Sequence, residues 1–131
     1  MRIAASAYAA DELAAEWRET SASALRAACA CAHDVLATQG HSLRTADFIA
    51  TLAVESAIHY LDLTVDLPWA ADPDPGALAL VRVVLDGLLG IPMPGGWDDR
   101  TYALKGTGRT PVSDAERSSI GALADRLPLF G

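Results

Sequence analysis

The chain has 131 residues, 51% of them hydrophobic, and a formal net charge of −7. This hydrophobic content lies well above that of disordered chains and is enough for one modest core. The negative charge argues against sequence-independent binding to nucleic acid and against binding to an anionic membrane surface, because both need a basic face. We therefore expect a globular protein with neither kind of partner.

The N-terminal segment and the cysteines indicate a cytoplasmic protein. Residues 1–13 contain one basic residue and no continuous apolar core, so they make a poor signal peptide. No apolar run reaches the roughly 18 residues that a membrane helix needs. Cys29 and Cys31 lie two positions apart in a helical pattern, where their side chains diverge by about 160° and cannot bridge each other. Reduced thiols in a cytosol fit this spacing best.

The first predicted helix covers residues 11–38. Its apolar side chains recur at spacings of three, four and seven, and Gly40 follows as a C-terminal cap. In such a helix Cys29 and His33 would lie one turn apart, where a thiolate and an imidazole can bind zinc. Cysteine in an alanine-rich helix is more often a small apolar filler, and we favour that interpretation.

The second predicted helix, residues 45–67, is the feature around which the chain is organised. Thr45 is placed as its N-cap, and Pro68 ends it. At 100° per residue, its main polar side chains fall in one stripe about 80° wide, and most of the remaining circumference is apolar. The stripe contains the polar residues Glu55, His59, Asp62 and Asp66, and it also includes Phe48 and Leu52. It is either a solvent-exposed edge or a metal site.

The charges around this stripe favour a cation. Residues 45–81 contain six acidic residues and no lysine or arginine, whereas a face exposed only for solubility usually mixes both signs. Glu55 and His59, one turn apart, can present a carboxylate oxygen and an imidazole nitrogen to one divalent ion. Asp62 would be an additional ligand or would orient the imidazole. The spacing alone has low specificity, because many surface helices contain it by chance.

The remaining elements are a third helix, a loop or hairpin, and a last helix. Residues 74–89 predict a helix, with Asp74 as N-cap and proline at its first position. Residues 97–111 alternate around a glycine turn and predict a loop or a small hairpin; the GTGR sequence at 106–109 is its turn, with a phosphate-binding loop as the weaker alternative. A capping box begins the last helix at 114–126. With no repeat and no domain boundary, residues 1–131 are predicted to form one mainly α domain.

Two stretches resemble a known family. The sequence FIATLAVESAIHYLDLTVDLP is similar to the end of the DinB-like four-helix bundle in actinobacterial mycothiol-dependent maleylpyruvate isomerase-type proteins. In that family the pattern E-x-x-x-H-x-x-D-L supplies metal ligands, and Glu55, His59, Asp62 and Leu63 match it position by position. The tail TYALKGTGRTPVSDAERSSIGALADRLPLFG also resembles the segment C-terminal to the bundle in these proteins. The resemblance covers residues 13–131.

The resemblance implies a partial DinB-like bundle. Residues 11–38 and 45–67 would be its third and fourth helices, whereas the first two helices, with the histidine that supplies the third metal ligand, would be missing. We expect a homodimer to complete the bundle, because an apolar helical hairpin leaves a large exposed patch. An incomplete site is expected to bind zinc or nickel at Glu55 and His59, with Asp62 in support.

The resemblance also implies an activity. A metal-bound low-molecular-weight thiol, mycothiol, would attack a small electrophile, which is isomerase or thiol S-transferase chemistry. One alternative is a non-catalytic helical protein that retains the fold for dimerisation or partner binding. Another is a metal-binding protein without turnover.

Overall fold

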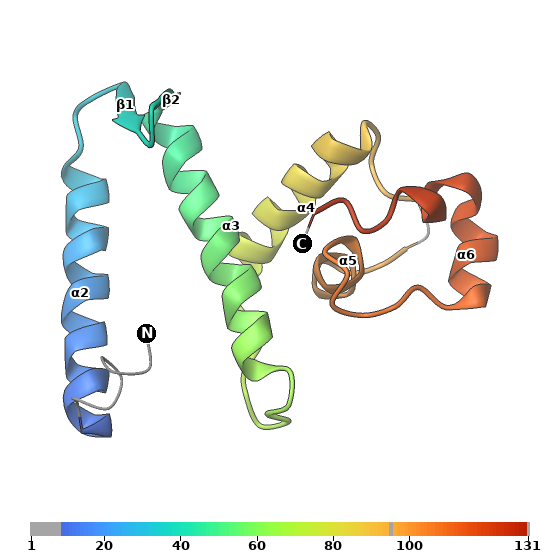
Figure 1. Ribbon diagram of the computed structural model, residues 1–131, viewed down its shortest axis with the longest axis horizontal. Helices are drawn as coiled ribbons and strands as arrows, with labels where there is room; N and C mark the ends of the chain where they lie inside the picture. The colour runs from blue at the N-terminus through green and yellow to red at the C-terminus, as the bar shows by residue number, and fades with distance from the viewer. Residues whose placement is uncertain (1–8, 95, 131) are drawn as a thin grey trace. The chain divides into compact units, whose positions relative to one another are not determined.

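The structure is a computed structural model that describes residues 9–94 and 96–130. It is mainly helical and has one small two-stranded sheet, as Figure 1 shows, so the predicted mainly α class is confirmed. The elements are α2 (Ala10–Ala30), β1 (Val35–Thr38), β2 (His41–Arg44), α3 (Thr45–Thr64), α4 (Pro75–Leu89), α5 (Asp99–Gly106), α6 (Asp114–Ile120) and the 3-10 helix η1 (Gly121–Arg126). In this part of the chain no helix is long and apolar enough to cross a membrane.

The chain divides into two compact units. The first comprises Met1–Ile49 and the second Ala50–Gly131. Helix α3 begins in the first unit, and its greater part belongs to the second. The single domain stays a prediction, and each unit is described by itself.

In the first unit, a β-hairpin replaces the end of the predicted first helix. Helix α2 ends at Ala30, and residues 35–38 form β1, so the predicted range 11–38 is wrong beyond Ala30. The reason is the turn at Gln39 and Gly40, which both have positive φ, 47° and 82°. Two consecutive residues in the left-handed conformation suit the tight turn of a hairpin, in which Thr38 pairs with His41. Gly40 is thus a hairpin residue and not a helix cap.

The base of this hairpin is closed by hydrogen bonds from one residue. The backbone N–H of Thr45 donates to the carbonyl of Asp34 at 2.9 Å, and the Thr45 hydroxyl donates to the carbonyl of His33. Thr45 is buried, although most of its neighbours are exposed. Helix α3 therefore starts where the second strand ends.

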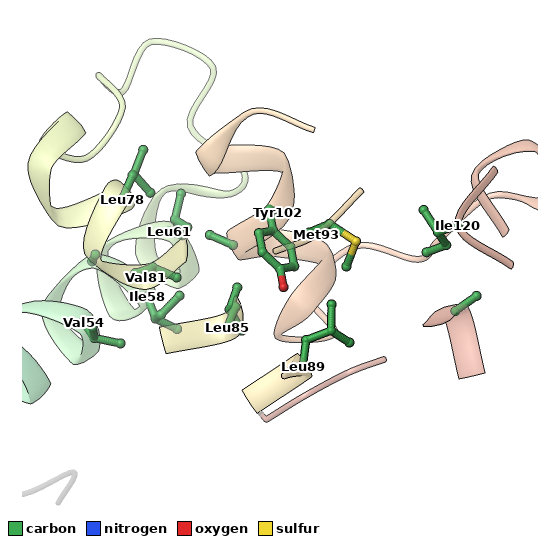
Figure 2. Packing of buried hydrophobic residues seen from close by; sticks show 13 residues of the cluster. Val54, Ile58, Leu61, Leu78, Val81, Leu85, Leu89, Met93, Tyr102 and Ile120 are labelled. Carbon is green, nitrogen blue, oxygen red and sulfur yellow. The ribbon is translucent and has the colours of Figure 1, made fainter. Parts of the chain in front are cut away.

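The hydrophobic core lies in the second unit. Figure 2 shows side chains from α3, α4 and α5 converging there. Helix α3 contributes residues at the i, i+3, i+4, i+7 spacing of one helical face. The buried set is Val54, Ala57, Ile58, Leu61, Leu78, Val81, Leu85, Leu89, Met93, Tyr102, Ala103, Ile120 and Ala124.

Local signals set the ends of α3 and α4. Helix α3 stops at Thr64, three residues before the predicted end, because the chain turns ahead of Pro68, with Leu67 N–H donating to the Thr64 carbonyl at 2.9 Å. Helix α4 starts at Pro75, and Asp74 accepts hydrogen bonds from the first-turn amides. Gly90 ends α4 in the left-handed conformation, with φ of 80°.

The loop or hairpin expected at 97–111 is wrong for residues 99–106, which form helix α5. Asp98 is its N-cap and accepts from the Thr101 amide at 2.6 Å. Tyr102, Ala103 and Gly106 are buried together, which is helical and not strand spacing. The GTGR segment therefore begins at the last residue of α5 and continues as the turn that follows the helix.

The last predicted helix, 114–126, has two parts. Ser113 and Glu116 form a capping box at the start of α6, where each side chain accepts from the other residue's amide. Gly121 has φ of 59°, which interrupts the α-helix, and residues 121–126 continue as the 3-10 helix η1.

Candidate functional site: a histidine between two carboxylates

The three polar residues singled out on α3 lie together on its exposed surface. The side chains of Glu55, His59 and Asp62 are 56%, 69% and 41% exposed, and all three belong to the second unit. At 100° per residue they form a strip directly beside the buried face that contains Ile58 and Leu61. The helix therefore holds these side chains at the edge of the core, where both solvent and neighbouring segments can reach them.

His59 lies between the two carboxylates. Its Nε2 is 3.6 Å from Oε2 of Glu55, one turn before it, and its Nδ1 is 3.7 Å from Oδ2 of Asp62, which follows by three residues. Each ring nitrogen thus faces one carboxylate oxygen, slightly beyond hydrogen-bonding distance. His59 thus makes similar contacts with two carboxylates, one through each ring nitrogen.

Arg109 adds a fourth member that was not predicted from the sequence. Its Nε donates to Oδ1 of Asp62 at 2.5 Å, and its Nη2 donates to Oδ2 at 2.8 Å. Two parallel hydrogen bonds of this kind fix both the position and the plane of a carboxylate. We call Glu55, His59, Asp62 and Arg109 the α3 site.

Arg109 also corrects the inference drawn from the local charge. The acidic segment 45–81 has no base of its own, but bases from later in the chain pair with it. Arg109 reaches Asp62 across 47 positions, and Arg100 Nε lies 2.7 Å from Asp72 Oδ1. At least these two carboxylates are neutralised by arginines, so a bound cation is not required to balance them.

The end of α5 explains how Arg109 reaches α3. Gly106 packs against Leu85, leaving no space for a Cβ atom, and Gly108 turns the chain with φ of 75°. The Arg109 amide then donates to the Leu104 carbonyl at 2.8 Å, and its Nη1 donates to the Thr107 carbonyl at 3.3 Å. Both glycines of GTGR thus serve to place the arginine.

The ion pair shifts the pKa values of both partners. Hydrogen bonding from Arg109 is the main reason that the pKa of Asp62 is lowered, and the charges of Arg109 and His59 add to the effect. The same hydrogen bond is the main reason that the pKa of Arg109 is raised. Both groups stay ionised over a wide pH range, although partial exposure keeps the contribution to stability small.

The geometry fits a metal ion between Glu55 and His59 only in part. Two ligands on a tetrahedral zinc ion, each about 2.1 Å from the metal, lie about 3.4 Å apart. The separation of 3.6 Å between Glu55 Oε2 and His59 Nε2 is close to that value. Within residues 9–94 and 96–130, however, no three or more histidine, cysteine or acidic side chains are grouped so that they can hold a metal ion. The α3 site thus offers a pair of donors.

The other candidate ligands belong to the first unit. Cys29 and His33 do not share a helix, because α2 ends between them, so the predicted i, i+4 pair does not form. Cys31 and His33 line a cavity of about 560 Å³ together with Arg44. Both cysteines are free.

Comparison with protein-family models, with curated proteins and with solved structures found no match to this chain.

Proposed function

We propose that the α3 site binds one divalent metal ion, zinc or nickel, through Glu55 Oε2 and His59 Nε2. The observation that carries the proposal is the spacing of these two atoms, 3.6 Å, which suits two ligands of one ion. Asp62 supports the imidazole from its opposite nitrogen, as carboxylates commonly do for metal-binding histidines. Because the side chains of Glu55 and His59 are more than half exposed, further ligands from outside have access.

We further propose that the chain is related to the DinB-like, mycothiol-dependent maleylpyruvate isomerase proteins. The E-x-x-x-H-x-x-D-L pattern of α3 and the mainly helical fold support this relationship. A divalent ion would lower the pKa of a bound thiol and so supply a thiolate at neutral pH. In this cytoplasmic isomerase or thiol S-transferase, Glu55 and His59 hold the ion, and Asp62 orients His59.

Metal content tests the binding step. The full chain is purified without chelators, its zinc and nickel are measured, and zinc binding is then followed by calorimetry. His59→Ala should weaken zinc binding at least tenfold, since it removes one of two donors. His41→Ala is the matched control, an exposed histidine in the hairpin, and should leave binding unchanged. Equal zinc binding by wild type and His59→Ala contradicts the proposal.

Mycothiol tests the proposed chemistry separately. A ligand that binds the folded state raises the melting temperature in proportion to the logarithm of its concentration. We expect mycothiol to stabilise the metal-loaded protein and to have no effect after metal removal or in His59→Ala. If mycothiol stabilises the protein equally with and without metal, the thiol does not bind through the metal. The protein would then bind metal without the proposed turnover.

A second candidate function, homodimerisation without catalysis, is favoured by exposed apolar side chains. On α2, Leu13, Trp17 and Leu25 are 49%, 74% and 66% exposed, and on α3 Leu63 is 78% exposed. Surfaces of this kind usually mark interfaces. A second copy that covers these apolar side chains with its own would form the dimer, with or without a metal.

Solution mass tests the dimer. We expect light scattering to give twice the chain mass, and Trp17→Glu to shift it toward the monomer. Trp69→Glu is the matched control, because Trp69 is 79% exposed but lies in the loop after α3. A monomeric wild type at micromolar concentration excludes the dimer.

A further inference from the structure

The α3 site contains two half-sites for a cation rather than one. The pair Glu55 Oε2 and His59 Nε2 is separated by 3.6 Å, and the pair Asp62 Oδ2 and His59 Nδ1 by 3.7 Å. Either separation is close to the roughly 3.4 Å expected of two ligands on one tetrahedral ion. Distance alone therefore does not decide which nitrogen of His59 binds.

Arg109 makes the two half-sites unequal. It donates to both oxygens of Asp62, at 2.5 and 2.8 Å, and Oδ2, which receives the second bond, is the oxygen that faces Nδ1 of His59. A cation at the Nδ1 side would have to displace the guanidinium and would lie beside its positive charge. The side-chain hydrogen bonds of Arg109 go to Asp62 and to the Thr107 carbonyl, whereas among the described residues Glu55 interacts with it through charge alone.

We propose that Arg109 is a specificity-determining residue that closes the Asp62 half-site and so directs the metal ion to Nε2 of His59 and Glu55. This inference rests on the proposed function, since the choice of nitrogen has meaning only if the site binds an ion. It also gives the GTGR segment a role, because Gly106 and Gly108 place Arg109 beside α3. It also predicts that removing the arginine moves the ion and does not abolish binding.

The test is the effect of Arg109→Gln on a protein that has lost Glu55. In the wild-type background, Glu55→Gln should weaken zinc binding at least tenfold, because the Asp62 half-site is closed. In Glu55→Gln/Arg109→Gln, Asp62 becomes available, and affinity should return to within about threefold of wild type. Adding Asp62→Asn to that double variant should remove the recovered binding. Calorimetry with zinc gives the affinities, and thermal unfolding checks that each variant is folded.

Two controls separate this mechanism from a general effect of charge. Arg100→Gln removes another paired arginine of the same unit and should not rescue Glu55→Gln. Arg109→Lys keeps the charge but cannot form two parallel bonds, so it should rescue only partly, and it carries the test if Arg109→Gln does not fold. A direct measurement uses 113Cd and 15N-labelled histidine, where coupling to Nε2 is expected in the wild type and to Nδ1 in the double variant.

The outcomes distinguish this inference from the proposed function. A wild type that binds no zinc or cadmium overturns the proposed function. If the wild type binds zinc through Glu55 but neither Arg109→Gln nor Arg109→Lys restores binding to Glu55→Gln, the inference alone is overturned. Rescue that persists after Asp62→Asn, or cadmium coupled to Nε2 in every variant, also overturns it, because Asp62 would then not be the new ligand.

Discussion

Gly106 and Leu85 lie so close together that a Cβ atom on residue 106 would come within 2.8 Å of Leu85 Cδ1. Leu85 is completely buried, so its side chain would have to shift within the core to admit that atom. We expect Gly106→Ala to lower the free energy of unfolding by about 1–3 kcal/mol, the usual cost of overpacking a core. Urea denaturation measures this change.

Gly87 provides the matched control for that prediction. It lies in α4, is exposed, and a Cβ atom there would meet nothing within 4 Å. Gly87→Ala should raise the free energy of unfolding by up to about 1 kcal/mol, because alanine favours helix. If Gly106→Ala raises the free energy of unfolding as Gly87→Ala does, the close contact at Gly106 does not restrict the core.

Tyr102 should make the protein sensitive to alkaline pH. Its side chain is fully buried, and this burial, with the nearby Asp86 charge, raises its pKa from 10.0 to about 12. The unfolded chain loses the phenolic proton near pH 10, whereas the folded protein keeps it, so stability falls between pH 10 and 12. Urea denaturation across this range should show a smaller loss for Tyr102→Phe. If stability falls equally with pH in the wild type and in Tyr102→Phe, the predicted rise in the pKa of Tyr102 is excluded.

Tyr102→Phe also has an expected effect at neutral pH. Among the described residues, the Tyr102 hydroxyl is buried without a hydrogen-bond partner. Removing an unsatisfied buried donor should leave the free energy of unfolding unchanged or raise it by about 1 kcal/mol. A clear loss of stability would show that the hydroxyl does have a partner, for which Asp86 is the candidate acceptor because it contributes to the raised pKa of Tyr102.

Glu116 should contribute to sensitivity at acid pH. A hydrogen bond from Lys105 at 2.8 Å, followed by bonds from Ser113, lowers its pKa from 4.5 to about 2. Because the folded-state pKa is depressed, the contribution to stability is present above pH 4.5 and is lost as pH falls toward 2. Glu116→Gln should flatten this part of the stability profile. Glu16→Gln, on exposed α2, should leave it unchanged.

The N-cap of α4 allows a test of a single side chain. Asp74 Oδ1 accepts from the amides of Gly76 at 2.9 Å and Ala77 at 3.2 Å. Asp74→Ala should lower the free energy of unfolding by about 1 kcal/mol, whereas Asp74→Asn retains an acceptor and should cost much less. Equal losses in the two variants would point to the charge of Asp74 instead of its hydrogen bonds.

Local signals in the sequence predicted the elements that depend on local chemistry. Asp74 and Pro75 mark the start of α4, and Gly90 its end, because caps are set by residues next to one another. The helical period likewise placed Glu55 and His59 on one face of α3. These relationships need no knowledge of the rest of the fold.

The remaining features depend on packing or on an uncommon turn. The alternation of Tyr102 and Leu104 suggested a strand, but burial of Tyr102 with Ala103 beside α4 selects a helix. The hairpin at 35–44 was missed because glutamine rarely adopts the left-handed conformation that Gln39 has. Arg109 could not be assigned to Asp62, since 47 positions separate them and only the folded chain joins them.

The hydrogen bonds at Thr45 make the hairpin a permissive place for protein engineering. The chain leaves at Asp34 and returns at Thr45, where backbone and hydroxyl bonds join the two ends. A segment that begins and ends at one point can change in length without altering where the next helix begins, and loop closure grows only slowly more costly with length. A short epitope or a tetracysteine tag inserted between Gln39 and Gly40 would therefore report on the protein in cells while leaving the register of α3 intact.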